Sequence, residues 1–140
     1  ASQALRDHPW AGVGLDQFGT YVRQQAAQGR ASPEVAKYNH SHNEYLEWAA
    51  TGGVPGLLVL LSIFGFPLVY FARHVQCTHQ TVSVPANAGL VVVLMYALCA
   101  LTDNVFYRAM PHSLYCVLVL GLAVLIGRHR TQAGRAGPEA

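Results

Sequence analysis

The chain has 140 residues, of which 52% are hydrophobic and only 11% are charged, whereas a typical soluble domain carries about 25% charged residues. The formal net charge is +2, and the basic residues are too scattered to form the stripe that follows a nucleic-acid backbone. This composition excludes a disordered segment and a coiled coil, and we expect no nucleic-acid partner. It predicts an all-α membrane protein whose helices are buried in lipid.

Charged side chains of both signs are spread over residues 1–51, so this stretch cannot span a bilayer. Near its end, the pattern predicts an amphipathic helix that starts at about His42, with Ser41 or Asn39 as its N-cap. Gly52 and Gly53 would end that helix. The pattern therefore predicts a helix, a tight elbow and then a membrane span.

Three uncharged runs follow, at residues 54–72, 87–102 and 109–127. At about 1.5 Å of rise per residue, such runs approach the roughly 30 Å thickness of the hydrocarbon core. They predict a polytopic protein with a polar segment over 1–53, a three-helix transmembrane region over 54–127 and a tail over 128–140.

The orientation of the spans follows from their flanks, because Lys and Arg are retained on the cytoplasmic side. Arg73 ends the first run, and Arg128 and Arg130 follow the third. We therefore expect both ends, and the tail, in the cytoplasm. The polar segment 1–53 and the connection 103–110 then share the opposite face, which is periplasmic if the membrane is a bacterial inner membrane.

The cysteines give no sign of a metal or a disulfide framework. Cys77, Cys99 and Cys116 are an odd number without metal-ligand spacing, and two of them lie inside apolar runs. They are typical of small apolar residues in a membrane core. We expect neither a metal nor a cofactor.

Two motifs in the polar segment resemble a known family. His42-Asn43 is followed by nine residues, then Gly53, two residues and Gly56. This spacing is similar to the His-Asn and Gly-x-x-Gly motif of the bacterial O-antigen ligase superfamily, which also includes O-antigen polymerases and protein O-oligosaccharyltransferases. Upstream, His8-Pro9 followed by Gly12-x-Gly14 resembles the segment that opens the large periplasmic loop of these proteins.

The resemblance implies transfer of a glycan from an undecaprenyl-diphosphate carrier to an acceptor hydroxyl on lipid A-core, on a polysaccharide or on a protein. The motifs do not separate these three acceptors. Family members have many more spans than the three expected here, so we expect this chain to be the C-terminal part of a longer protein. Much of the donor site would then come from upstream helices.

Such a transfer needs a base, because an acceptor hydroxyl is a poor nucleophile. An imidazole can take its proton near neutral pH, and His42 is the candidate base. We expect Asn43 and His40 to contact the substrate. The four motif glycines are expected to shape the backbone: Gly12, Gly14, Gly53 and Gly56.

The leaving diphosphate calls for guanidinium groups, which are always charged and form paired hydrogen bonds with phosphate. Arg23, Arg30 and Arg108 lie on the expected outer face. They are assigned to the diphosphate by their chemistry and by that face alone, because no motif aligns them with the arginines of the family.

A plainer interpretation stands beside each of these. His42 can be a polar residue at a helix start, and Gly12 and Gly14 can form a simple turn. Tyr107 and Trp48 lie near span ends, where aromatic belts form regardless of function. The alternative hypothesis is a non-enzymatic membrane subunit, or an inactive remnant, whose helices pack with partner membrane proteins.

Overall fold

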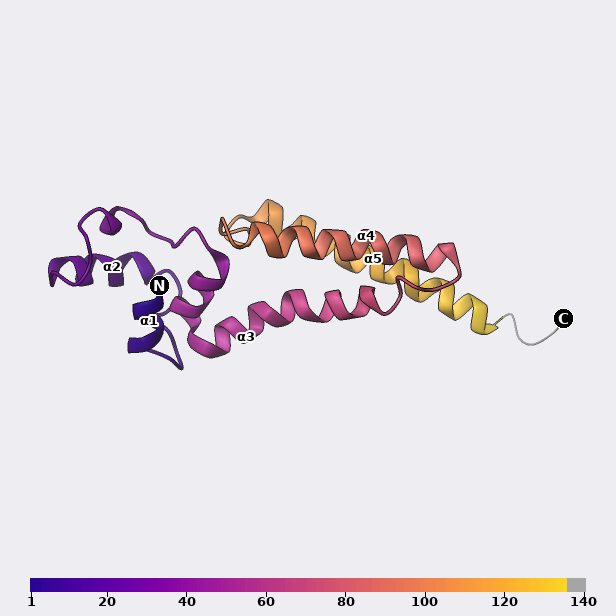
Figure 1. Cartoon of the computed structure of the whole chain (residues 1–140), viewed down its shortest axis with the longest axis horizontal. Helices are drawn as coiled ribbons and strands as arrows, with labels where there is room; N and C mark the ends of the chain where they lie inside the picture. Colours follow the sequence, from indigo (N-terminus) through magenta and orange to yellow (C-terminus); the bar gives the residue numbers. More distant parts are fainter. Residues whose placement is uncertain (136–140) are drawn as a thin grey trace. The chain divides into compact units, whose positions relative to one another are not determined.

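The computed structural model describes residues 1–135, and these residues contain helices and no strand (Figure 1). The all-α prediction is confirmed. Residues 136–140 of the expected tail lie outside the described residues. The elements in chain order are α1 (Ser2–Asp7), α2 (Phe18–Ala27), the short 3₁₀ helix η1 (Val35–Lys37), α3 (Glu44–Ala72), α4 (Gln80–Cys99) and α5 (Ala109–Arg135).

Three of these helices are long and apolar enough to cross a membrane: α3, α4 and the part of α5 over Ala109–His129. The prediction of three span candidates is confirmed by length and composition. The second expected run, 87–102, differs from α4 at both ends. Hydropathy marks the part of a helix that suits lipid and leaves out its polar first turns, so α4 begins earlier, at Gln80.

The chain divides into two compact units, each described here by itself. The first unit comprises Ala1–Ser62 and Leu98–Tyr107, and the second comprises Ile63–Ala97 and the chain from Arg108 onward. Helix α3 contributes residues up to Ser62 to the first unit and residues from Ile63 onward to the second.

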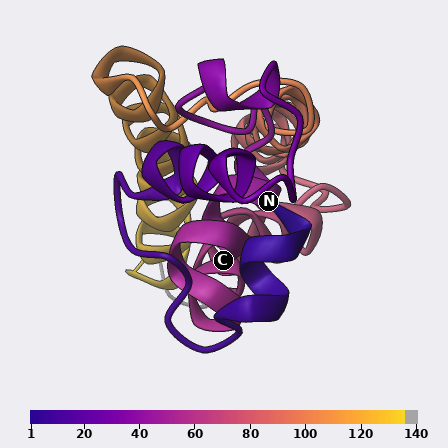
Figure 2. The same cartoon turned by 90° about the vertical axis from the view of Figure 1, so that its left-hand side faces the viewer.

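A small apolar core holds the first unit together. Ala4 of α1, Phe18 and Val22 of α2, and Ala50 of α3 are all buried and pack in one cluster. Figure 2 shows α1 beside the first half of α3. Burying a side chain as large as Phe18 stabilises a fold by about 1.5–3 kcal/mol. The polar segment is therefore a folded unit of short helices, anchored on α3.

In the second unit, tyrosine hydroxyls tie the long helices together. Tyr115 of α5 donates to the Ile63 carbonyl of α3 (2.8 Å), and Tyr70 of α3 donates to the Ala123 carbonyl of α5 (3.3 Å). Gly89 of α4 faces the ring of Phe71, which would lie 2.5 Å from a Cβ at that position. A small residue that admits a neighbour this closely is typical of helix packing in membranes.

Candidate active site around His42

The expected elbow lies within α3, at Gly53. This residue has φ 65° and ψ −157°, a conformation that is essentially restricted to glycine. The first part of α3, residues 44–52, therefore ends at Gly53, and a second helix begins at Val54. Both helix ends leave backbone groups without partners inside the helix.

The upstream motif supplies those partners. The Pro9 carbonyl accepts from Val54 N (2.8 Å), while Val13 N and Gly14 N donate to the carbonyls of Ala50 (2.8 Å) and Thr51 (3.0 Å). The segment from His8 to Gly14 thus hydrogen-bonds to both sides of the elbow. The two motifs, about forty residues apart in the sequence, form one structural element.

Glycine is required where these two segments meet. A Cβ on Gly12 (φ 64°) would lie 2.3 Å from the carbonyl carbon of Thr51, and a Cβ on Gly53 would lie 2.5 Å from the Pro9 oxygen. Both distances are far inside van der Waals contact, and both neighbours are backbone atoms. Gly56 lies against the Trp48 carbonyl in the same way, at 2.9 Å.

The start of α3 differs from the expectation in its capping residue. The helix begins at Glu44, and the N-cap is Asn43, whose Oδ1 accepts from Leu46 N (3.0 Å). Ser41 and Asn39, the expected caps, are engaged elsewhere: Ser41 Oγ donates to the Asn43 carbonyl, and Asn39 Oδ1 accepts from Arg23. The spacing rule failed because all three side chains can cap, and tertiary contacts decide which one does.

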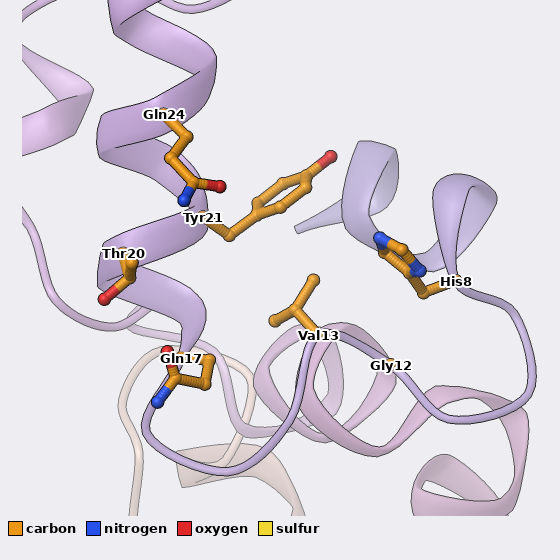
Figure 3. Close-up of a pocket in the computed structure, with 7 residues that line it drawn as sticks. All are labelled: His8, Gly12, Val13, Gln17, Thr20, Tyr21 and Gln24. Carbon is orange, nitrogen blue, oxygen red and sulfur yellow. The ribbon is translucent and has the colours of Figure 1, made fainter.

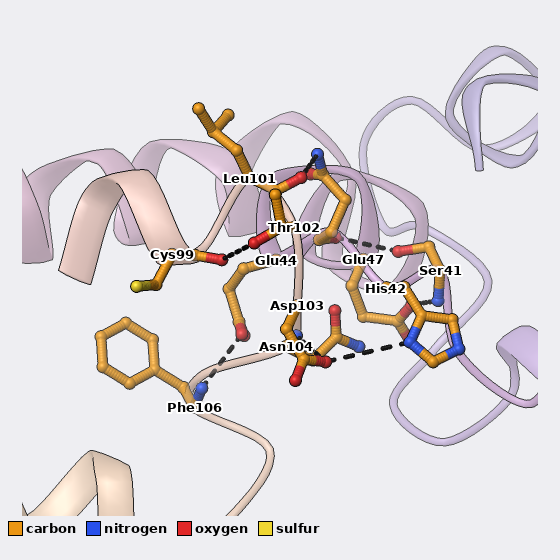
Figure 4. A network of polar contacts seen from close by, with 11 residues as sticks. Ser41, His42, Glu44, Glu47, Cys99, Leu101, Thr102, Asp103, Asn104 and Phe106 are labelled. Carbon is orange, nitrogen blue, oxygen red and sulfur yellow. Dashed lines mark hydrogen bonds and ion pairs between the residues drawn. The ribbon is translucent and has the colours of Figure 1, made fainter. Parts of the chain in front are cut away.

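His42 stands just before this cap in the left-handed region, with φ 51°. Its Nδ1 lies 3.9 Å from Asp103 Oδ1, and both side chains are exposed, by 54% and 72% (Figure 4). Asp103 belongs to the loop that follows α4. The structure therefore brings together a histidine and a carboxylate that are 61 positions apart.

Glu44 is the residue that holds this loop in place, and sequence reasoning missed it. It is only 3% exposed. Its Oε2 accepts from Phe106 N (3.0 Å), its Oε1 accepts from Trp48 Nε1 (2.7 Å), and its own backbone N donates to the Ala100 carbonyl (2.8 Å). Figure 4 shows the carboxylate reaching Phe106. A glutamate directly after His-Asn, with tryptophan one helical turn later, is the pattern that could have indicated it.

Asn43 makes a second tie to the same loop. Its Nδ2 donates to the Leu101 carbonyl (2.9 Å), so both ends of its side-chain amide have backbone partners. These contacts also explain why α4 ends at Cys99, earlier than expected, since the carbonyls of Ala100 and Leu101 accept from Glu44 and Asn43.

Asn104 is the unusual member of the loop. It is 6% exposed, and neither polar atom of its side chain has a hydrogen-bond partner among the described residues. Its backbone N donates to Asp103 Oδ1 (2.8 Å), which orients the carboxylate that faces His42.

The remaining site candidates lie in different places. Arg23 of α2 donates to Asn39 Oδ1 (3.1 Å) and Thr20 Oγ1 (3.4 Å), so it braces the loop that leads to His40. Arg30 is exposed after the end of α2. Arg108 is exposed and lies directly before α5. It belongs to the second unit, whereas His42 belongs to the first.

An open hollow of about 210 Å³ lies between the upstream motif and α2 (Figure 3). Its polar lining includes His8, Gln17, Thr20, Tyr21 and Gln24. The Tyr21 hydroxyl donates to Asp7. Burial, reinforced by this hydrogen bond, raises the pKa of Tyr21 to about 12, and the same bond lowers the pKa of Asp7. Across residues 1–135, no three His, Cys, Asp or Glu side chains gather as a metal site would require.

Taken together, the described residues define an all-helical protein that has a folded polar segment and three helices long and apolar enough to cross a membrane. Residues 1–61 of the chain match the family model described as O-antigen ligase. The resemblance carried by the two motifs is therefore confirmed over this segment, which is similar to the O-antigen ligase family. A search of curated proteins finds none that matches the chain.

Proposed function

We propose that the chain is the C-terminal portion of an O-antigen ligase-like glycosyltransferase in a bacterial inner membrane. It moves a glycan from an undecaprenyl-diphosphate carrier to an acceptor hydroxyl on the periplasmic face. The observation that carries the proposal is the position of His42, which is exposed, faces Asp103 and lies within the segment that matches the family.

His42 acts as the general base in this proposal. Its Nε2 takes the proton of the acceptor hydroxyl while the hydroxyl oxygen attacks the anomeric carbon of the donor sugar. The new carbon–oxygen bond forms as the bond from that carbon to the diphosphate breaks, and the electron pair leaves with undecaprenyl diphosphate.

Asp103 is the positioning residue for this base. Its carboxylate faces the other ring nitrogen, Nδ1, at 3.9 Å. At that distance a negative charge stabilises the imidazolium that forms when the proton is taken. Asn43 and Glu44 act one step further away, since they fix the loop that carries Asp103.

Among the candidate arginines, the contacts favour Arg23 over Arg30 for the leaving diphosphate. Arg23 donates to the neutral side chains of Asn39 and Thr20, so its positive charge stays available to an anion. The hydrogen bond from Tyr21 is the main cause that lowers the pKa of Asp7, and the positive charge of Arg30 adds to it, so Arg30 already has an acidic neighbour. Arg108 directly follows Tyr107 in the chain and remains a candidate by chemistry.

The test is glycan transfer by the protein that carries this chain, in membranes that contain the lipid-linked donor. We expect His42→Ala to reduce transfer by about 100-fold to 10,000-fold, the usual contribution of a general base. His40→Ala should cost much less. Protein abundance should not change, because the His42 side chain is exposed. A His42→Ala variant that accumulates normally and still transfers at the parental rate would refute the assignment.

A further inference from the structure

Four aromatic rings form a continuous row around His42. In order they are Tyr38, His42, His40 and Tyr107, and successive ring centroids are 5.8, 4.5 and 5.5 Å apart. The row joins two segments that are distant in the sequence, the loop before α3 and the loop after α4. The candidate base is therefore part of an aromatic surface.

The two ends of this row face outward. Tyr38 is 55% exposed and Tyr107 is 67% exposed, although burying an aromatic ring of this size would stabilise the fold. Tyr107 stacks on His40, with 21° between the ring planes, so one face of each ring lies toward the other ring. The outward faces remain available to a ligand.

The row is also held in place before any substrate arrives. Tyr107 N donates to the Asn104 carbonyl (3.3 Å), and the neighbouring Phe106 N is bound by buried Glu44. On the other side, Arg23 holds Asn39, which lies between Tyr38 and His40 in the chain. Rings that are already ordered lose little conformational entropy when a ligand stacks on them.

The chemistry of such a surface fits a sugar ring. The face of an aromatic ring is electron-rich and attracts the weakly positive C–H groups that one face of a pyranose presents. The hydroxyls at the edge of the same sugar need acceptors, and the exposed carboxylate of Asp103 lies at the row. A serine or threonine acceptor brings a single hydroxyl and no flat C–H face.

We propose that this row is the acceptor subsite, and that Tyr38 and Tyr107 select an acceptor hydroxyl carried by a pyranose ring rather than by a serine or threonine side chain. The proposal rests on the function proposed above, because it takes His42 as the base. Tyr38, His40 and Tyr107 bind the acceptor sugar and present its hydroxyl to His42.

The test compares Tyr107→Leu and Tyr38→Leu with Tyr107→Phe, in the protein that carries this chain. A stacking contact of about 1 kcal/mol corresponds to roughly fivefold in affinity. We expect each leucine variant to raise the KM for a water-soluble core oligosaccharide by about fivefold to tenfold, with kcat little changed. Tyr107→Phe keeps the ring and should stay close to the parent.

The matched control is Phe66→Leu, which removes another exposed aromatic ring, on α3 beyond the elbow. If the tyrosines serve only as membrane anchors, all of the leucine variants will shift membrane association and none will shift the acceptor KM. That result would overturn the proposal.

Saturation-transfer NMR of the same oligosaccharide with the solubilised protein provides a readout that does not depend on turnover. We expect contacts from the C–H face of the sugar to the parent protein and their loss in both leucine variants. An unchanged acceptor KM in those variants, with transfer still abolished by His42→Ala, would overturn the subsite and leave the proposed function standing. Absence of oligosaccharide contacts to the parent, or more efficient transfer to a serine- or threonine-containing peptide, would also overturn it.

Discussion

Glu44 is the most consequential side chain that the sequence did not single out. A carboxylate next to a His-Asn pair is easily assigned to the favourable electrostatics of a helix N-terminus. In the structure it is buried and accepts from the backbone of one loop and the indole of Trp48. That role depends on a contact across 62 positions, which no local pattern encodes.

We expect Glu44→Ala to loosen the loop after α4. The change removes the carboxylate that accepts from Phe106 N and Trp48 Nε1 in two part-buried hydrogen bonds, and losing the acceptor of a fully buried donor costs about 1–3 kcal/mol. The thermal midpoint of the solubilised protein should fall, and Trp48 fluorescence should shift toward that of a solvated indole.

The matched control is Glu34→Ala, because Glu34 is exposed and its carboxylate pairs with the neighbouring, exposed Lys37. Exposed pairs of this kind contribute little to stability. If the two variants have the same midpoint and the same emission, the loop is not held by Glu44.

The Tyr21–Asp7 hydrogen bond stabilises the folded polar segment only within a defined range of pH. The pKa of Asp7 is lowered, so its contribution to stability is present above the ordinary carboxyl pKa and is lost as pH falls through the folded value. The pKa of Tyr21 is raised from 10.0 to about 12, so its contribution is present below pH 10 and is lost as pH rises through 12.

Replacing Asp7 with Asn should therefore lower the pKa of the Tyr21 phenol, although not to its ordinary value, because burial is the largest single cause of the shift. Tyrosinate absorbance during an alkaline titration measures this, and the spectrum of a Tyr21→Phe variant identifies the phenol concerned. An Asp7→Asn titration that overlays the parent's would contradict the hydrogen bond.

At the scale of elements, the interrupted helix α3 was predictable from its sequence. The glycines after Thr51 indicated an elbow, and the apolar run indicated the span beyond it. The hydrophobic periodicity did not reveal which segment packs against the elbow. The docking of residues 8–14 onto it consists of backbone hydrogen bonds, and a backbone group carries no residue-specific signal. For the same reason, the end of α4 was misplaced.

We expect Gly53→Ala to disrupt this elbow. Alanine is strained at φ 65° and ψ −157°, and its Cβ would meet the Pro9 oxygen at 2.5 Å. Backbone strain of this kind costs about 1–3 kcal/mol before the steric clash is added. Limited proteolysis of residues 1–53 should accelerate, and transfer should fall.

Gly65→Ala is the control in the same helix. A Cβ there meets no atom within 4 Å, and alanine is the better helix former, so stability should stay equal or rise slightly. Equal sensitivity of the two variants to protease would show that the elbow tolerates a side chain.

At the scale of the whole molecule, the three span candidates within residues 1–135 followed from hydropathy, whereas the contact between His42 and Asp103 did not. Hydropathy is a sum over neighbours in the chain, so it finds α3, α4 and α5. A contact between two loops depends on how the intervening helices return, and a single sequence does not reveal that.

The expected orientation places the polar segment outside the cell membrane and the end of α5 inside. In a background without the native cysteines, Gln28→Cys should react with a membrane-impermeant thiol reagent in cells with a permeabilised outer membrane. Thr131→Cys should react only after lysis, because the arginine-flanked end of α5 is retained in the cytoplasm. The reverse pattern would place His42 on the wrong face for a periplasmic donor.

The way residues 8–14 dock on the elbow has a consequence for divergence. The hydrogen bonds involve main-chain atoms of Pro9, Val13 and Gly14, while Trp10 and Leu15 turn outward and are 79% and 84% exposed. Mutations can therefore accumulate on this outer surface while the frame that positions His42 is unaffected. A lineage of such proteins can therefore change the chemistry of this outer surface while the backbone contacts that hold the elbow stay the same.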